Sequence, residues 1–127
     1  MQGGTAMTVY VDDMRAAYGR MKMCHMMADT LDELHAMADR IGVARSWFQD
    51  TMRPHYDIAL SKRALAIAAG AREVTLRQMA AMAWNMRRTG SMGDPETAVK
   101  AMLAAKDAER TPEERQRWAD FRKSLGT

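Results

Sequence analysis

The sequence has few of the features that crosslink, anchor or export a small protein. Cys24 is the only cysteine among 127 residues, so no disulfide can form within the chain, and a reducing compartment is favoured. No run of apolar residues is long enough to span a membrane. The N-terminus has no basic segment followed by an apolar one, so no signal peptide is expected. We therefore expect a cytoplasmic protein that does not act at a membrane.

Short motifs that assign a chemistry by themselves are also missing. The sequence contains no P-loop, GxGxxG fingerprint, CxxC pair, zinc-protease helix or GxSxG nucleophile elbow. Its charge is close to balanced: the net value is +3, and residues 91–127 carry seven basic and seven acidic side chains. Dedicated duplex binders are usually more basic than this. Nucleic-acid binding therefore remains one alternative among several.

What the sequence does contain is an ordinary globular composition, with 47% hydrophobic and 28% charged residues. Its length fits one domain with a real core. Alternating and helical patterns predict strands separated by helices, which favours a small, partly parallel sheet flanked by helices, an α/β fold. The expected strands are 7–11, 22–27, 55–58 and 72–74, and the expected helices are 30–42, 62–69 and 75–87.

Several helix boundaries have local signals. Thr30 with Glu33, and Thr75 with Gln78, have the spacing of capping boxes. Ser61 is expected to cap the middle helix. Residues 14–20 are expected to form a loop.

The chain divides into an α/β core at 7–88, a linker at 89–94 and a helical tail at 95–127. The linker is rich in Gly and Ser. Proline follows a capping residue at Asp94 and again at Thr111, which predicts the starts of two tail helices. We expect these helices to form a hairpin that packs on the domain or on a partner.

Asp12 and Asp13 directly follow the first predicted strand. In open α/β sheets, ligands bind beyond the carboxyl ends of strands. Carboxylates at that position can hold Mg²⁺ and so place a phosphate group. The alternative is that one aspartate caps a turn and the other is solvated.

The histidines supply a second group of candidates. His25 alternates with methionines on an apolar row, where it needs a polar partner. His55 and Asp57 share one face of a strand, and an imidazole beside a carboxylate can act as a base or a metal ligand. The alternative for each is a structural hydrogen bond. His35 lies between the apolar positions of its helix and is expected at the surface. We predict that His25, His55, Asp57 and Asp12 surround one concavity.

Ser61, Lys62 and Arg63 open a predicted helix. The N-terminus of a helix presents free N–H groups and partial positive charge, and a hydroxyl and two cations there favour phosphate binding. The alternative is a serine cap followed by two solvated cations.

Several segments together resemble a known family. They are Thr8–Arg15, with its YVD motif, and Cys24–Thr30, Glu33–Gly42, Trp47–Gln49 and Pro54–Asp57. They resemble a small bacterial and phage family known as domain of unknown function 4031, and the likeness extends from Met7 to about residue 80. The resemblance implies a bacterial or phage source and no established activity. Val9–Asp12 is also similar to the first strand of small Rossmann-like nucleases, but the further acidic residues of such nucleases have no counterpart here.

Three functions follow from these observations. The first is binding, and in one form hydrolysis, of a phosphate-bearing small molecule such as a nucleotide. The second is a protein-interaction module, in which the 14 methionines or the helical tail contact a partner. The third is a metal-dependent nuclease or phosphodiesterase.

Overall fold

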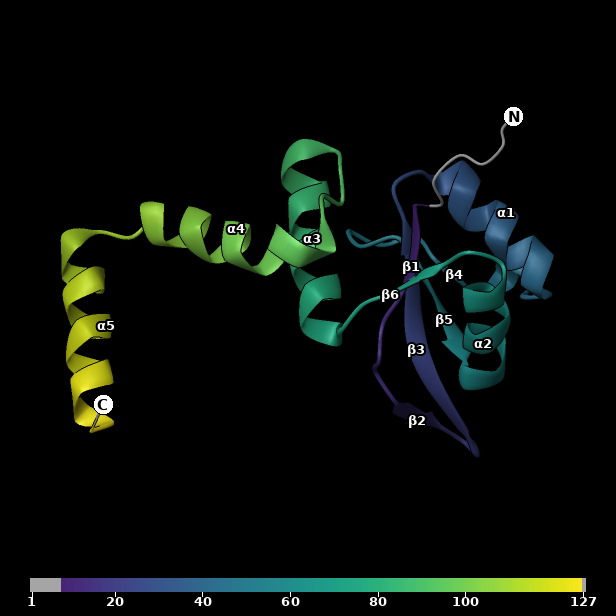
Figure 1. Cartoon of the computed structure of the whole chain (residues 1–127), viewed down its shortest axis with the longest axis horizontal. Coiled ribbons are helices and arrows are strands. Elements are labelled where there is room, and N and C mark those ends of the chain that lie inside the picture. Colours follow the sequence, from purple (N-terminus) through teal and green to yellow (C-terminus); the bar gives the residue numbers. More distant parts are fainter. Residues whose placement is uncertain (1–7, 127) are drawn as a thin grey trace.

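A six-stranded sheet lies between two layers of helices in the computed structural model, which describes residues 8–126 (Figure 1). The strands are β1 Val9–Val11, β2 Ala16–Tyr18, β3 Met21–Ala28, β4 Phe48–Gln49, β5 His55–Ala59 and β6 Arg72–Glu73. The helices are α1 Leu31–Ile41, α2 Leu60–Ala68, α3 Leu76–Thr89, α4 Pro95–Ala108 and α5 Pro112–Ser124, with a 3-10 turn, η1, at Arg45–Trp47. The predicted α/β class is confirmed.

The sheet has the order β4-β5-β3-β1-β6, and β2 pairs with the beginning of β3. β1 and β6 are parallel, whereas the other pairs are antiparallel, so the sheet is partly parallel as predicted. The register places Val11 opposite Met26 and His25 opposite Asp57. The end of β1 and the middle of β5 therefore flank the same part of β3, one on each side.

Each face of the sheet has its own hydrophobic core. Val9 and Val11 point to the face covered by α1 and α2, while Tyr10 points to the face covered by α3, with α4 packed behind it. β3 divides in the same way, because Cys24 and Met26 join the α1/α2 core. The predicted alternation is therefore confirmed, and it directs His25 toward α3.

Helix caps form mainly where the sequence indicates them. Thr30 accepts the Glu33 N–H, and Gly42 ends α1 with φ 79°. A complete capping box opens α3. The prediction for Ser61 is wrong: β5 continues directly into α2, so Ala59 is the N-cap residue and Ser61 lies within the first turn.

The predicted loop at 14–20 is also wrong, since its middle forms β2. β2 pairs with β3 through a tight turn in which Gly19 has φ 60°. All three residues of β2 are exposed. An exposed strand has no hydrophobic alternation, so the sequence carried no signal for it.

The two tail helices form where the sequence predicts them. α4 packs on α3 and buries Pro95 and Ala98. Met92, which precedes α4 in the chain, is fully buried. α5 buries none of its residues and lies farthest from the sheet (Figure 1). Among the described residues, no helix is both long enough and apolar enough to cross a membrane. The division into core, linker and tail remains a prediction.

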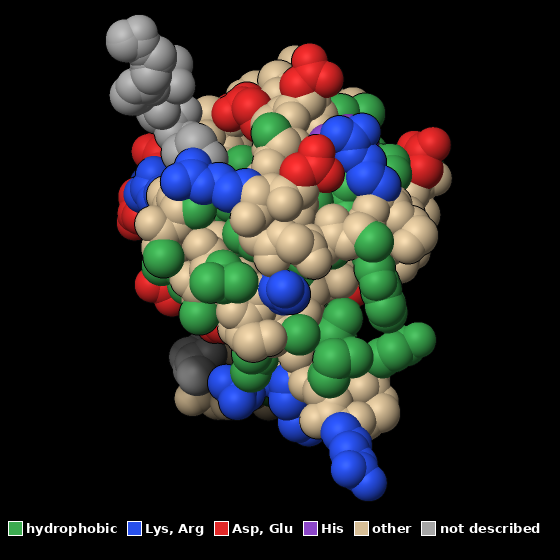
Figure 2. Space-filling view, turned by 90° about the vertical axis from the view of Figure 1, so that its right-hand side faces the viewer, with side chains coloured by type: hydrophobic (Ala, Val, Ile, Leu, Met, Phe, Trp, Pro, Cys, Tyr) green, Lys and Arg blue, Asp and Glu red, His purple; other side chains and the backbone are tan. Residues whose placement is uncertain are grey.

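The face covered by α1 and α2 shows basic and acidic side chains interspersed, with hydrophobic side chains gathered low on its right (Figure 2). Only a trace of histidine is visible on it. A mixed surface of this kind provides no extended basic path for a nucleic-acid backbone.

Candidate functional site

His25 and Asp12 form a close pair at the centre of the sheet. The Nδ1 atom of His25 lies 2.7 Å from Oδ2 of Asp12. The other carboxylate oxygen of Asp12 accepts the backbone N–H groups of His25, at 3.0 Å, and Met14, at 3.2 Å. Asp12 is fully buried, and these contacts replace the hydrogen bonds to water that its carboxylate loses on burial.

This pair shifts both pKa values. Burial raises the pKa of Asp12, but hydrogen bonds from the ring and backbone of His25 outweigh it, so the pKa is lower than usual. The hydrogen bond to Asp12 raises the pKa of His25 and outweighs the opposing effect of burial. The charged pair, carboxylate with imidazolium, is therefore stabilised in the folded protein.

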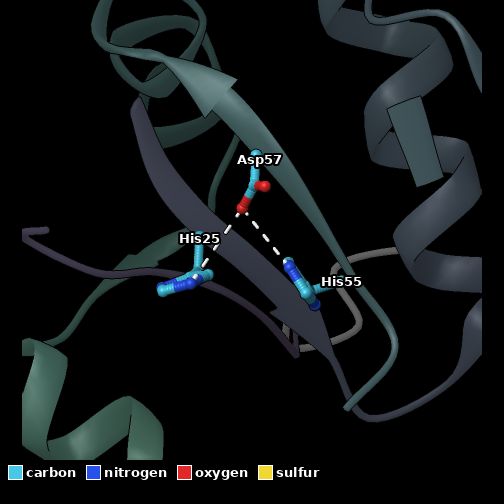
Figure 3. Close-up of side chains that lie close together, drawn as sticks. All are labelled: His25, His55 and Asp57. Carbon is cyan, nitrogen blue, oxygen red and sulfur yellow. Dashed lines mark ion pairs between the residues drawn. The ribbon is translucent and has the colours of Figure 1, made fainter. Parts of the chain in front are cut away.

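A second pair lies beside the first. The Nδ1 atom of His55 is 2.6 Å from the Arg53 carbonyl oxygen, and its Nε2 atom is 3.3 Å from Oδ1 of Asp57. The Nε2 atom of His25 is 4.0 Å from the same Asp57 oxygen. The two imidazole rings meet edge to face, with centroids 5.1 Å apart. Figure 3 shows both histidines directed at Asp57 from neighbouring strands.

The hydrogen-bond partners assign the imidazole tautomers. A carbonyl oxygen only accepts, so Nδ1 of His55 carries a proton when it bonds to Arg53. The same reasoning places a proton on Nδ1 of His25, which faces the Asp12 carboxylate. In neutral rings both Nε2 atoms then present lone pairs toward Asp57. Among the described residues, His25, His55 and Asp57 are the one group of side chains close enough together to hold a metal ion.

His25 and His55 line a pocket of about 150 Å³ between the sheet and α3. One wall is apolar and comes from Met27 and from side chains of α3, including Met79. The polar part of the lining includes Thr51 and Arg53, which lie in the loop before β5. The pocket therefore combines proton-transfer groups, a cation and an apolar surface.

Asp12, His25, His55 and Asp57 lie close together, as the ion pairs between them show. They do not all surround one concavity, since His25 and His55 line this pocket, Asp57 lines neighbouring hollows and Asp12 is fully buried. Their catalytic roles remain predictions.

Asp13 lies apart from this group. Its Oδ1 atom accepts the Leu76 N–H at 2.7 Å, so it satisfies the start of α3. Asp12 directs its oxygens to His25 and Met14 instead. A shared Mg²⁺ site at Asp12 and Asp13 remains a prediction, but each carboxylate is engaged in a different contact.

Ser61, Lys62 and Arg63 do not line the histidine pocket. They belong to α2, which packs on the other face of the sheet. Arg63 donates from Nε to the Asp12 carbonyl oxygen at 2.8 Å and pairs with Glu73 at 3.2 Å. Arg63 thus ties the end of β1 to α2 and β6. A phosphate site at this triplet remains a prediction separate from the pocket.

The sequence did not predict the positions of two groups of side chains. Arg53 and Thr51 lie in an irregular loop, where no periodic pattern marks them; the one local signal is their position just before the His55 strand. His35 is half-buried rather than at the surface, because its Nδ1 atom bonds the Tyr56 hydroxyl at 2.7 Å and its ring packs on Phe48.

A family comparison covers the same region as this site. The family described as a protein of unknown function, DUF4031, matches residues 9–86. The chain belongs to this family. The match includes all of β1–β6, the helices α1 and α2, most of α3 and each residue of the histidine pocket. No curated protein and no solved structure matches the chain significantly.

Proposed function

We propose that this DUF4031 protein binds a phosphate ester in the histidine pocket and hydrolyses it. The observation that carries the proposal is the joint position of His25, His55 and Arg53 around one small cavity. An arginine binds phosphate oxygens through charge-assisted hydrogen bonds, and imidazoles are the side chains best suited to proton transfer near neutral pH.

The size of the pocket limits what it can hold. Its volume of about 150 Å³ is below the roughly 300–1,000 Å³ that sites for drug-sized ligands usually have. It therefore accommodates one end of a ligand, and the remainder extends past the opening. Met27 and Met79 provide an adaptable apolar surface for a flat or apolar group attached to the phosphate. A nucleotide has this combination of anion and flat ring.

Hydrolysis at this site consumes one water molecule. The water oxygen forms a bond to phosphorus, the phosphorus–oxygen bond to the leaving group breaks, and the products are inorganic phosphate and the leaving group, which is an alcohol from a monoester or a shorter nucleotide from a nucleoside di- or triphosphate. Asp57 and the two imidazoles are the groups placed to accept the proton of the water and to return one to the leaving oxygen. Arg53 offsets negative charge on the phosphate oxygens.

Phosphate release from a panel of esters tests this proposal. Full-length protein is incubated with p-nitrophenyl phosphate and with nucleoside mono-, di- and triphosphates, in buffer with micromolar Zn²⁺ and millimolar Mg²⁺. We expect turnover of at least one ester and its loss in His55→Gln. Arg53→Gln should weaken ester binding by at least about tenfold, since a hydrogen bond to a charged group contributes about 1.5–3 kcal/mol.

Arg40→Gln is the matched control for Arg53→Gln, because Arg40 is an exposed arginine of α1 outside the pocket. It should behave as the wild type. Neither binding nor release for any ester would contradict the proposed function, and so would equal losses in the two arginine variants.

A protein-interaction role is the second candidate, and α5 is the observation that favours it. Trp118, Phe121 and Leu125 are 44–61% exposed on a helix without buried residues. Exposed aromatic side chains of this kind are enriched in protein interfaces. Removing residues 111–127 separates the two candidates: a protein whose work is hydrolysis keeps its phosphate release, whereas an interaction module loses its contact surface.

A further inference from the structure

We propose that His25, His55 and Asp57 bind a divalent transition-metal ion. The donor atoms of these three side chains all lie within 4.8 Å of one another. They come from the adjacent strands β3 and β5, so the sheet fixes their spacing. The proposal deepens the proposed function, but the geometry carries it without reference to the substrate.

A positive charge is favoured between the Nε2 atoms of His25 and His55 and the carboxylate of Asp57. Since Nδ1 of each histidine donates to an oxygen, the Nε2 atom of each ring is the one that faces Asp57, and in the neutral rings that bind metals it presents a lone pair there. Three electron-rich atoms that face one another repel unless a proton or a metal ion lies between them. A metal ion satisfies all three atoms together, whereas one proton serves a single nitrogen–oxygen pair.

The distances are close to those of a metal site. Zinc bonds to nitrogen and oxygen of about 2.0–2.1 Å in tetrahedral geometry separate neighbouring ligand atoms by about 3.4 Å. The pair formed by His55 and Asp57 is already at 3.3 Å. The pair formed by His25 and Asp57 is at 4.0 Å, so it must close by less than about 1 Å, which a small rotation of a side chain supplies.

The surroundings of both imidazoles match those of metal-bound histidines. A histidine that binds a metal usually donates its other N–H to a carboxylate or a backbone carbonyl, which fixes the ring and its tautomer. Asp12 fills this role for His25, and the Arg53 carbonyl fills it for His55. The Arg53 carbonyl is itself held in place, because it accepts a hydrogen bond from Thr51.

The donor set indicates the class of metal. Two imidazoles and one carboxylate favour zinc, iron(II) or a similar ion over Mg²⁺ and Ca²⁺, which prefer oxygen ligands. Cys24 adds no thiolate, since it is fully buried on the other face of the sheet. Three protein ligands leave at least one coordination position open, as in catalytic rather than structural sites. Both histidines line the pocket and Asp57 lines a neighbouring hollow, so the ion would lie at the edge of the pocket.

A metal ion here identifies the nucleophile of the proposed hydrolysis. With the ion bound, His25, His55 and Asp57 would act as its ligands in place of the proton-transfer role that they have in the metal-free route. The ion would supply the nucleophile, because it lowers the pKa of a bound water molecule so that the water loses its proton to solvent near neutral pH. The resulting hydroxide attacks phosphorus, and the leaving oxygen takes a proton from solvent. The ion and Arg53 would then contact the same phosphate group from two sides.

Zinc titration of the metal-free protein tests the inference. Full-length protein without an affinity tag is treated with a chelator, dialysed and titrated with Zn²⁺ in a calorimeter. We expect one ion per chain. In imidazole NMR spectra, zinc should shift the Nε2 resonances of His25 and His55 and leave those of His35 unchanged, because His35 lies on α1 and bonds Tyr56 instead.

Variants assign the ligands. His55→Gln and Asp57→Asn should each lower zinc affinity by more than the roughly 10–100-fold loss typical of removing a supporting residue. His35→Gln is the matched control and should bind zinc as the wild type does. Circular dichroism checks that each variant is folded, and the wild-type NMR titration decides the matter if one is not.

Other outcomes would overturn the inference. These are the absence of stoichiometric binding, zinc shifts at His35, or full affinity in both ligand variants. Phosphate release that persists in excess chelator would reject the metal site and leave the proposed function standing. Zinc binding without release of phosphate from any ester would do the reverse.

Discussion

The carboxylate of Asp12 lies 2.7 Å from the Nδ1 atom of His25, and it is fully buried beneath that ring. Asp12 therefore acts on the pocket only through His25. It fixes the tautomer of the ring and aims the Nε2 atom at Asp57. This makes Asp12 a positioning residue.

Asp12→Asn tests this role. The amide keeps the shape of the side chain but removes the charge, so the pKa of His25 should fall toward its ordinary value. Zinc affinity should drop by about 10–100-fold. Stability should fall by about 1–3 kcal/mol in urea unfolding, because a buried hydrogen bond to a charged group is lost. Unchanged zinc affinity in a folded variant would show that Asp12 is purely structural.

Arg63 is expected to contribute to stability through its contact with Asp12. Its side chain is only 20% exposed, and it donates to the Asp12 carbonyl oxygen at 2.8 Å. Arg63→Gln should therefore lower the free energy of unfolding by about 1.5–3 kcal/mol, while the protein still folds. Lys62→Gln, one position earlier on α2, should change it by less than about 0.5 kcal/mol. Equal effects of the two substitutions in urea unfolding would show that the Arg63 hydrogen bond is dispensable.

Cys24 should be unreactive in the folded protein. Burial, reinforced by the nearby Asp12 charge, raises the pKa of its thiol to about 12. Since the thiolate is the reactive form, alkylation by iodoacetamide at pH 8 should be far slower in buffer than in urea. Mass spectrometry over time measures both rates. Rapid alkylation in buffer would mean that β3 opens readily.

Two truncations test the predicted domain boundary. Removal of residues 111–127 deletes α5, which buries no residue, so the melting temperature should stay the same. Removal of residues 89–127 also deletes Met92 and Ala98, which are buried against α3. The sequence predicts that this shorter chain still melts cooperatively, and the loss of buried contacts places its melting temperature lower. Loss of the transition would show that the tail completes the core.

The sequence predicted much of the fold because its signals are local. The Thr30 and Thr75 caps, the glycine that ends α1 and the alternation of Val9, Tyr10 and Val11 each lie within a few residues. β2 was not predicted because all of its residues are exposed and it forms only through pairing with β3. Ser61 was misplaced because a strand that continues directly into a helix leaves no loop for a capping residue.

The candidate site was only partly visible in the sequence. His25, His55 and Asp57 could be grouped because alternation fixes the faces of their strands. Their common contact depends on the register of β3 against β5, which no local pattern encodes. Arg53 enters the pocket from a loop. Ser61–Arg63 looked like a phosphate site because they open a helix, but helix packing directs them to the other face of the sheet.

The proposed hydrolysis requires that the phosphate group binds in the histidine pocket. Crystals of the full chain, soaked with Zn²⁺ and then tungstate, test it most directly, because tungstate imitates phosphate and both metals are located by anomalous scattering. We predict zinc between His25, His55 and Asp57, with tungstate beside it and in contact with Arg53. Tungstate at Ser61–Arg63 instead would contradict phosphate binding in the histidine pocket, and zinc elsewhere on the chain would contradict the metal site.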